Sequence, residues 1–598
     1  MLFFPTVDED VAYFRSQGYT GSLNDMHYKA MGDLGYTGSL NDRTHAYLTF
    51  KYGSYYAAMR DLRNGTSVFA LSPYIINGFD PALVFDFKGD YYKTGGATTT
   101  FSSAITHAAT TNATMVDSDG LLKWRPHNLL THSGDLTNAG WTKLRITLAT
   151  GQNDFEGNPT AFKITPTAVS GSHAFYKSTP NTNLVNGILS TVTIDLKADG
   201  YNFFSVASEN NRYAIINLSN GAVSLNTGSV SPTVTSLGNG WYRCSITTSL
   251  NQQEVLSVVE TPQAANHGAT TFTGDGTSGV LVAYPHSFRS DLGGMVNNLD
   301  TNSSYVPTTS AVVYAPRRGH HIYNGSAWVN EGILHESEAR TNLLLNSGTL
   351  STQSATVANV ANTLSFTGTG TVTLSGVSTA GPLVGTGTGE NNRVSLTFTP
   401  TAGTLTLTVS GTVTNAQLEA GSTPSSYIPT AGASATRAAE TLTAPAANLP
   451  YDSTNMSIQI DGKMTYADNG LAGEVEYYRW QLGSIDYIFS YLSTQTGRSG
   501  QPIFAQRQAA SGYDDVKGGN LGYSPDTNVP FNRASRHGST FINGAHEGTL
   551  LTANTTPTIL PDLSTTDLLL GYTFMGTIGQ FRMWDEDITD AGITEAST

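Results

Sequence analysis

The sequence predicts a mainly β protein, with a short α-helical N-terminal head followed by serial antiparallel β-sandwiches. Three observations predict this fold class. Apolar and polar residues alternate in many short stretches after about residue 80, and Asn-Gly pairs punctuate several of them. Charged residues make up only 13% of the chain, and the small polar residues that replace them suit sheets joined by turns. At 598 residues the chain is too long for a single core, so we expect several domains.

The first 65 residues follow a helical pattern. The stretch "GYTGSLND" occurs at 18–25 and again at 35–42. In each copy a serine, Ser22 or Ser39, can cap a new helix, with an aspartate three residues later in capping-box position. The helices are only about three turns long and are marginal alone. We therefore expect the head to pack on itself, on copies of itself or on a partner.

The remainder of the chain has a period of two. In "TVTIDLK" (191–197) the apolar residues share one face, and "VSLTFT" (394–399) and "MSIQI" (456–460) follow the same pattern. The pairs Asn220-Gly221, Asn324-Gly325 and Asn543-Gly544 each suit a two-residue hairpin turn, because both residues tolerate positive φ. The pattern predicts antiparallel sandwiches.

Two pairs of similar motifs indicate that one module is used twice. "NLLTHSG" (128–134) matches "NLLLNSG" (342–348), and "SSYVPT" (303–308) matches "SSYIPT" (425–430). Each copy opens on the first motif and closes on the second. We expect the tyrosine of each closing motif, Tyr305 or Tyr427, to pack on its own sandwich.

Several functions are not supported by the sequence. There are 31 Lys+Arg against 46 Asp+Glu, which argues against nucleic-acid binding, and no apolar run approaches the roughly 18 residues that membrane insertion needs. The N-terminus lacks the pattern of a secretory signal. We found no catalytic motif, so we predict no enzyme, no catalytic residue and no cofactor.

No metal site is predicted either. The adjacent His320 and His321 point to opposite faces of a strand, and the acids of "DEDITD" (585–590) suit the start of a short final helix.

Longer motifs resemble bacteriophage tail and fibre proteins. They are "GYTGSLND", "DPALVFDF" (80–87), "ARTNLLLNS" (339–347) and "AQLEAGSTPSSYIPT" (416–430). Such proteins carry jelly-roll modules similar to carbohydrate-binding modules, and "NAGWTK" (138–143) and "GNGWYRCSI" (238–246) are typical of that module. The terminal stretch, from "STFINGAHEG" to "GQFRMWDEDITDAGI", resembles a concanavalin-like, laminin-G-like sandwich.

This resemblance divides the chain into six segments. They are a helical virion-docking head (1–70), a connecting β segment (71–125), a first jelly-roll sandwich (126–310), a β-hairpin connector (311–345), a short second sandwich (346–437) and a concanavalin-like sandwich (438–598).

The resemblance implies a structural virion protein of a tailed phage. It would assemble in the host cytoplasm, lie on the virion surface, contact other virion proteins through residues 1–70, form a homotrimer and bind a host-surface glycan. A polysaccharide depolymerase or glycoside hydrolase of the tail, and a purely architectural fibre without glycan affinity, remain as alternatives.

Aromatic residues supply the candidate ligand contacts. In "GEVEYYRW" (473–480), Tyr477, Tyr478 and Trp480 could stack on sugar rings, and Trp328 lies beside an Asn-Gly turn where it can be exposed. The alternative is that Trp480 fills the core of the last sandwich, since large aromatic residues mostly supply core area. The same stretch holds Glu474 and Glu476, where a pair of hydrolase carboxylates would be sought.

Overall fold

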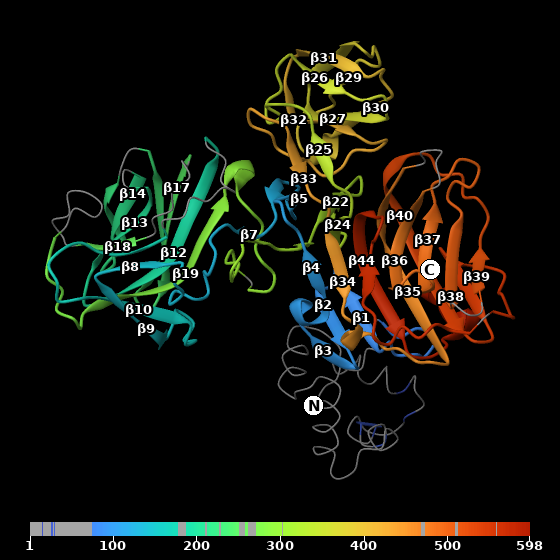
Figure 1. The fold of residues 1–598 in the computed structure, drawn as a ribbon, viewed down its shortest axis with the longest axis horizontal. Helices are drawn as coiled ribbons and strands as arrows, with labels where there is room; N and C mark the ends of the chain where they lie inside the picture. The colour runs from blue at the N-terminus through green and yellow to red at the C-terminus, as the bar shows by residue number, and fades with distance from the viewer. Residues whose placement is uncertain are drawn as a thin grey trace.

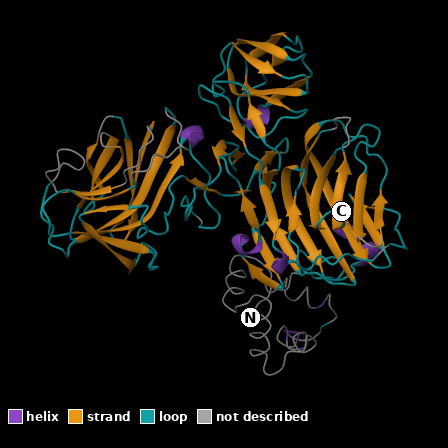
Figure 2. Cartoon of the chain, viewed as in Figure 1, coloured by secondary structure: helices purple, strands orange, loops and turns teal. Residues whose placement is uncertain are grey.

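The computed structural model describes residues 74–177, 187–209, 212–226, 229–249, 257–260, 271–301, 303–467, 473–508, 512–557 and 559–598, with the single residues Arg15, Tyr19, Met26, His27 and Lys29. The predicted fold class is confirmed, because these ranges form serial sandwiches of antiparallel strands (Figures 1 and 2). Apart from the five single residues, the helical head predicted at 1–70 lies outside the described residues.

Module 1, the first sandwich, consists of two six-stranded sheets that enclose an apolar core. One sheet has the order β16 (Ser231–Gly238), β17 (Trp241–Ser249), β12 (Leu189–Asp199), β19 (Gly279–Arg289), β10 (Ala161–Pro166) and β9 (Ile146–Gln152). The other has the order β15 (Ala222–Asn226), β14 (Arg212–Asn217), β13 (Phe203–Glu209), β18 (Ser257–Glu260), β11 (His173–Tyr176) and β8 (Thr142–Leu144). The single cysteine, Cys244, is buried in this core.

Module 2, the second sandwich, is smaller. Its four-stranded sheet has the order β26 (Gln353–Val357), β31 (Gly403–Ser410), β28 (Thr371–Gly376) and β29 (Leu383–Val384). Its three-stranded sheet has the order β30 (Val394–Phe398), β27 (Asn362–Gly368) and β32 (Val413–Ala420), and the short helix η2 (Glu390–Asn392) precedes β30. Leucine, valine and phenylalanine side chains fill the core between the two sheets.

The terminal sandwich is the largest unit. Its ten-stranded sheet follows the order β3 (Ala97–Thr99), β2 (Tyr91–Thr94), β1 (Leu83–Asp86), β44 (Met575–Trp584), β35 (Asn455–Tyr466), β40 (Asp526–Gly538), β41 (Ile542–His546) and β42 (Thr549–Leu550), with β24 (Ile333–Glu336) also on β44 and β21 (Arg317–Arg318) on β24. Its seven-stranded sheet follows the order β39 (Gly512–Lys517), β38 (Pro502–Gln508), β37 (Asp486–Ser493), β36 (Glu474–Leu482), β43 (Leu568–Leu570), β34 (Thr441–Ala444) and β4 (Thr106–Ala108).

Short elements complete the described fold. They are the pairs β5 (Thr114–Val116) with β6 (Leu122–Trp124), β7 (His127–Asn128) with β20 (Val313–Tyr314), β22 (His321–Tyr323) with β23 (Trp328–Asn330) and β25 (Arg340–Asn342) with β33 (Ala435–Arg437), and the helices α5 (Phe101–Ala104), α6 (Thr589–Ala596), η1 (Asp291–Gly293) and η3 (Ala446–Asn448).

The terminal sandwich draws strands from three separate parts of the chain. Strand β1 lies beside β44, with Val84 opposite Arg582, and β4 lies beside β34. The segments expected to be connectors, 71–125 and 311–345, therefore differ from that expectation, since they supply β1–β4, β21 and β24 to its sheets. The physical reason is burial: Leu83 and Phe85 lie in the same core as Phe581. Modules 1 and 2 project from this body on separate sides (Figure 1).

The first and last segments of module 1 are joined by a set of hydrogen bonds that we call the clasp. The side-chain amide of Asn128 donates to the carbonyl of Val306 (2.8 Å), and the hydroxyls of Ser133 and Tyr305 lie 3.0 Å apart. The amide of Ser133 donates to the hydroxyl oxygen of Thr308, and the amide of Thr308 donates to that of Ser133, both at 3.0 Å.

Module 2 has the same clasp. Asn342 donates to the carbonyl of Ile428 (2.9 Å), and the hydroxyls of Ser347 and Tyr427 lie 2.7 Å apart. Ser347 and Thr430 exchange the corresponding amide–hydroxyl bonds at 3.0 and 2.8 Å. The repeated motifs thus hold each module's two ends together, which lets a module be inserted into another domain. Tyr305 and Tyr427 pack on their own modules, as predicted.

Of the three predicted two-residue Asn-Gly turns, the first two lie in four-residue loops, 218–221 and 324–327, in which the glycine but not the asparagine has positive φ, and the last is not a turn. Asn543 and Gly544 lie inside β41, where Gly544 faces the ring of Phe504 so closely that a Cβ would come within 2.1 Å of it. The glycine is needed for this contact rather than for a turn. The chain reverses instead at Glu547-Gly548, between β41 and β42, where both residues have positive φ.

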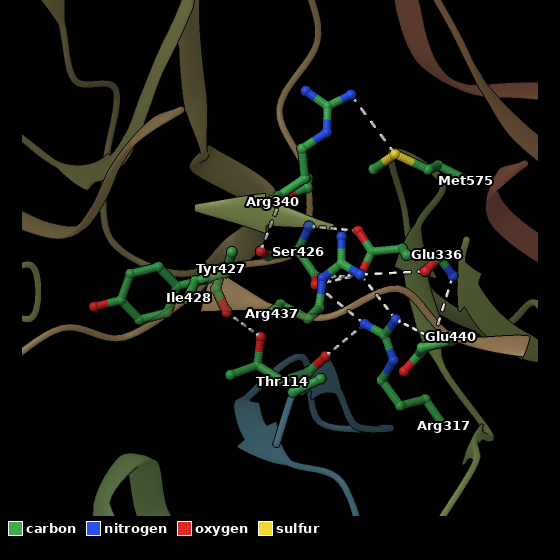
Figure 3. A network of polar contacts seen from close by, with 12 residues as sticks. Thr114, Arg317, Glu336, Arg340, Ser426, Tyr427, Ile428, Arg437, Glu440 and Met575 are labelled. Carbon is green, nitrogen blue, oxygen red and sulfur yellow. Dashed lines mark hydrogen bonds and ion pairs between the residues drawn. The ribbon is translucent and has the colours of Figure 1, made fainter. Parts of the chain in front are cut away.

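A buried charge cluster, the junction network, lies where the modules leave the terminal sandwich (Figure 3). It consists of Arg125, Arg317, Arg437, Glu336 and Glu440. Arg317 pairs with Glu336 (2.8 Å) and with Glu440 (2.7 Å), Arg125 pairs with Glu440 (2.6 Å), and Arg437 pairs with Glu336 (3.0 Å). Burial alone would raise the pKa of Glu336, but the guanidinium groups of Arg437 and Arg317 outweigh it and lower the pKa to about 2.

The network ties the inserted modules to the terminal sandwich. The backbone and hydroxyl of Ser426, in the closing motif of module 2, donate to Glu336 at 2.9 and 2.6 Å. Arg317 donates to the carbonyl of Thr114 (3.2 Å), whose hydroxyl donates to the carbonyl of Tyr427 (2.7 Å). A buried charge that loses its partner is strongly destabilising, so each partner must stay in place. This network therefore fixes where module 2 lies.

Candidate functional site

Three of the four predicted contact residues are in the core. Tyr477, Tyr478 and Trp480 are 0%, 1% and 0% exposed. A bulge between Glu476 and Tyr478 turns both tyrosines inward, where Tyr478 bonds the hydroxyl of Ser535 (2.8 Å) and the indole of Trp480 donates to the carbonyl of Thr566 (2.7 Å). These side chains cannot stack on a ligand, so for them the core alternative holds.

The other face of the same sheet carries a row of rings, of which Tyr487 is buried and Tyr513 is exposed. On β37, Ile488 and Leu492 belong to the core, so the alternating Tyr487 and Phe489 point to the outer face. Their rings stack with centroids 4.1 Å apart, and the ring of Tyr513, on β39, lies 6.4 Å from that of Tyr487.

Arginines extend this layer in both directions. The guanidinium of Arg479, on β36, lies 4.8 Å from the ring of Phe489 and 3.8 Å from that of Tyr572. The guanidinium of Arg507, on β38, lies 6.0 Å from the ring of Tyr487. We call this layer the ring face; its members are Arg479, Tyr487, Phe489, Arg507, Tyr513 and Tyr572. It runs from β39 to Tyr572 in the turn after β43, and four strand spacings of about 4.8 Å make it roughly 19 Å long.

The ring face is open to solvent at both ends and fixed in the middle. Tyr513 and Tyr572 are 46% and 45% exposed. Arg479 makes a two-pronged contact with Glu476, in which its Nε lies 2.6 Å from the carboxylate, so its plane is held against the rings. Planar groups held in one layer offer stacking surfaces at low entropic cost. The signal was present in "DYIFSYLS" (486–493), whose aromatic residues alternate with core residues.

Acidic groups flank this face. Glu476 is fully buried, whereas loss of hydration and the neighbouring carboxylate of Glu476 raise the pKa of Glu474 to about 7. Of the two carboxylates in "GEVEYYRW", one is therefore bound by Arg479 and closed off from solvent.

Trp328 lies elsewhere, in a cleft at the base of module 2. The cleft has a volume of about 360 Å³ and is lined by the β22–β23 hairpin, by module 2 and by the ten-stranded sheet. Trp328 contacts Tyr323 across the hairpin, with ring centroids 5.4 Å apart. Sequence reasoning selected this residue for its exposure beside a turn but could not place it against module 2.

The candidate metal-binding residues do not converge. His320 is buried beside the junction network and accepts from the amide of Val116 (3.1 Å), while His321 bonds the carbonyl of Gly319. Asp587 and Asp590 pair with Arg536 at 3.3 and 3.4 Å. Within the described ranges, no three metal-binding side chains form a group, and no helix there is long and apolar enough to cross a membrane.

No protein-family model matches the sequence, and no curated protein matches it. Among solved structures, the CBM40 of a Ruminococcus gnavus IT-sialidase is 12% identical over 24% of this chain and 84% of its own, with a TM-score of 0.20. A botulinum neurotoxin serotype D binding domain is 11% identical over 26% of this chain and 39% of its own, with a TM-score of 0.22. A leech intramolecular trans-sialidase is 16% identical over 24% of this chain and 23% of its own, with a TM-score of 0.21. Each similarity covers about a quarter of this chain, and scores this low assign no function.

Proposed function

We propose that this chain is a structural protein of a tailed-bacteriophage virion that binds host-surface glycans through the ring face of its terminal sandwich. The ring face carries the proposal. It presents a row of rings and guanidinium planes whose two ends, Tyr513 and Tyr572, are exposed, and apolar ring faces stack on the C–H faces of sugars. We propose a binding protein rather than an enzyme.

The virion setting rests on the resemblance of the sequence to phage tail and fibre proteins. We propose that residues 1–70 attach the chain to other virion proteins, and that a homotrimer presents three ring faces at once. Copies displayed together raise the strength of attachment far above that of one weak site. Negative-stain imaging of virions with an antibody to 438–598 tests the location, and particles that carry no label would refute it.

Point variants test glycan binding more cleanly than truncation. Deleting residues 440–598 would also remove β44, the partner of β1 and β24, and so disrupt the junction of all three units. We therefore propose the double variant Tyr513→Ala/Tyr572→Ala, with Leu189→Ala as the control, since Leu189 is 48% exposed on module 1.

The assay measures binding of each protein to an array of purified bacterial surface polysaccharides. We expect the wild type and the control to bind the same polysaccharide and the double variant to lose most of that signal. Wild-type binding that survives the double substitution would refute the ring face as the site. The absence of binding to any polysaccharide would favour the architectural fibre.

A further inference from the structure

The cleft at the base of module 2 is lined by other residues than the ring face. Parts of the chain far apart in sequence meet there: Trp328 of the β22–β23 hairpin, Glu390 and Arg393 beside η2, and Thr465 and Thr527 of the ten-stranded sheet. Its volume of about 360 Å³ is within the range of small-ligand sites. No residue of the ring face lines this cleft.

One wall of the cleft is aromatic and rigid. The indole of Trp328 rests on Gly120, where φ is +77° and a Cβ would come within 2.1 Å of the ring. Tyr323, which is 37% exposed, stands beside it at a tilt of 53°. A tryptophan held in place on one side offers a flat apolar surface to a ligand on the other.

The polar side of the cleft holds a carboxylate and a guanidinium that are paired with each other. The carboxylate of Glu390 lies 3.5 Å from Nη1 of Arg393, and the two side chains are 12% and 15% exposed. Nη2 of Arg393 donates to the hydroxyl of Ser365 (3.0 Å). Oε1 of Glu390 and Nε of Arg393 have no hydrogen-bond partner and are closed off from solvent, so a ligand reaches them only when these two side chains turn toward the cleft. Buried polar atoms in this state are costly unless a ligand or solvent satisfies them.

This arrangement defines the class of ligand. A carboxylate beside a guanidinium matches two adjacent hydroxyl groups, of which one donates to the carboxylate and the other accepts from the guanidinium. The charges of Glu390 and Arg393 cancel, so an anionic ligand gains no net attraction from the pair. The aromatic wall suits the apolar face of a pyranose ring.

We propose that this cleft binds a short neutral saccharide through adjacent hydroxyl groups, separately from the ring face. The site needs module 2 in its docked position, because Glu390 and Arg393 come from module 2 and Trp328 comes from the hairpin. Glu336 and Ser426 of the junction region also line the cleft, so the contacts that dock module 2 shape the site.

Tryptophan fluorescence can test this proposal on the full chain. Five of the six tryptophans are 2% exposed or less, so quenching by iodide reports mainly on Trp328. The probes are methyl glucoside, methyl galactoside, methyl mannoside, lactose and maltose, with glucuronate as an anionic comparison. We expect at least one neutral probe to shield Trp328 from iodide and to give saturation-transfer signals in NMR.

The variants Glu390→Ala and Arg393→Met should each weaken binding of that probe on the order of tenfold or more, because each removes a charged hydrogen-bond partner. Trp328→Phe keeps an aromatic ring on the cleft wall, so it should still bind the probe in the NMR experiment. It should lose the fluorescence signal, which shows that the signal comes from Trp328. The ring-face double variant should bind normally. No binding by any neutral probe, binding by glucuronate alone, or unchanged affinity in both polar variants would overturn the proposal.

Discussion

Nη2 of Arg317 lies 2.8 Å from the carboxylate of Glu336 and 2.7 Å from that of Glu440, and none of the three residues is more than 2% exposed. Glu336 ends the strand before module 2, and Glu440 follows the module. One arginine therefore binds the two points where the chain leaves and rejoins the terminal sandwich.

Replacing this arginine should loosen all three units. In Arg317→Met, two buried carboxylates lose a shared partner, which costs about 3 kcal/mol or more of unfolding free energy. Urea unfolding followed by circular dichroism measures the loss, with the exposed Arg498→Met as control. A midpoint equal to that of the control would contradict a stabilising role for the junction network.

The protein should lose stability as the pH falls below about 6.5. Burial, with help from Arg125 and Arg317 respectively, lowers the pKa of His107 and of His320 to about 3. Below about 6.5 the unfolded chain binds protons that the folded chain does not, so each histidine lowers the unfolding free energy by about 1.4 kcal/mol per pH unit down to about pH 3. Unfolding at pH 7, 6, 5 and 4 measures this slope. In His320→Gln the slope should be smaller by about 1.4 kcal/mol per pH unit, the contribution of one histidine. A slope equal to that of the wild type would refute the lowered pKa of His320.

The two clasps should respond alike to the same substitution. Ser133→Ala and Ser347→Ala each remove the acceptor of a threonine amide and the partner of a buried tyrosine hydroxyl. We expect each to cost about 1–3 kcal/mol. Hydrogen exchange at the amides of Thr308 and Thr430 measures local opening at each clasp. Faster exchange in only one module would show that the two clasps differ in strength.

Core and surface aromatic residues of the terminal sandwich should behave oppositely. Trp480→Ala removes a fully buried ring and should cost about 3–5 kcal/mol, whereas Tyr513→Ala should change stability by roughly 0.5 kcal/mol or less. Thermal unfolding of both variants measures the difference. A large loss of stability in Tyr513→Ala would mean that the ring face supports the fold rather than a ligand.

The alternation of apolar and polar residues predicted the strands well. It did not always predict which face of a strand is exposed. In β12, Val192 and Ile194 are in the core as expected, yet Thr193 and Asp195 on the opposite face are also buried. Arg243 satisfies Asp195 at 2.8 Å, a pairing between neighbouring strands that a single-strand pattern does not contain. The same limit explains "EYYRW", where a bulge shifts the phase of the strand and hides the tyrosines.

The candidate sites were harder to predict because they depend on distant pairings. Trp328 was selected from its turn, but Glu390 and Arg393, which line the same cleft, come from another module. The sequence predicts a β segment at 71–125, but nothing local indicates that its strand β1 pairs with β44 near the other end of the chain. Sequence repeats were more informative, since both copies of the clasp use matching residues.

The placement of β1 beside β44 also sets an order for biosynthesis. Val84 can pair with Arg582 only after roughly 500 more residues have been translated. At about 5–20 residues per second, a ribosome needs on the order of a minute for that length. Modules 1 and 2 lie wholly between these two strands and can close their own clasps while translation continues. A message cut short before β44 would yield chains with both modules formed and no body to carry them. Only a chain translated through β44 can join the three units.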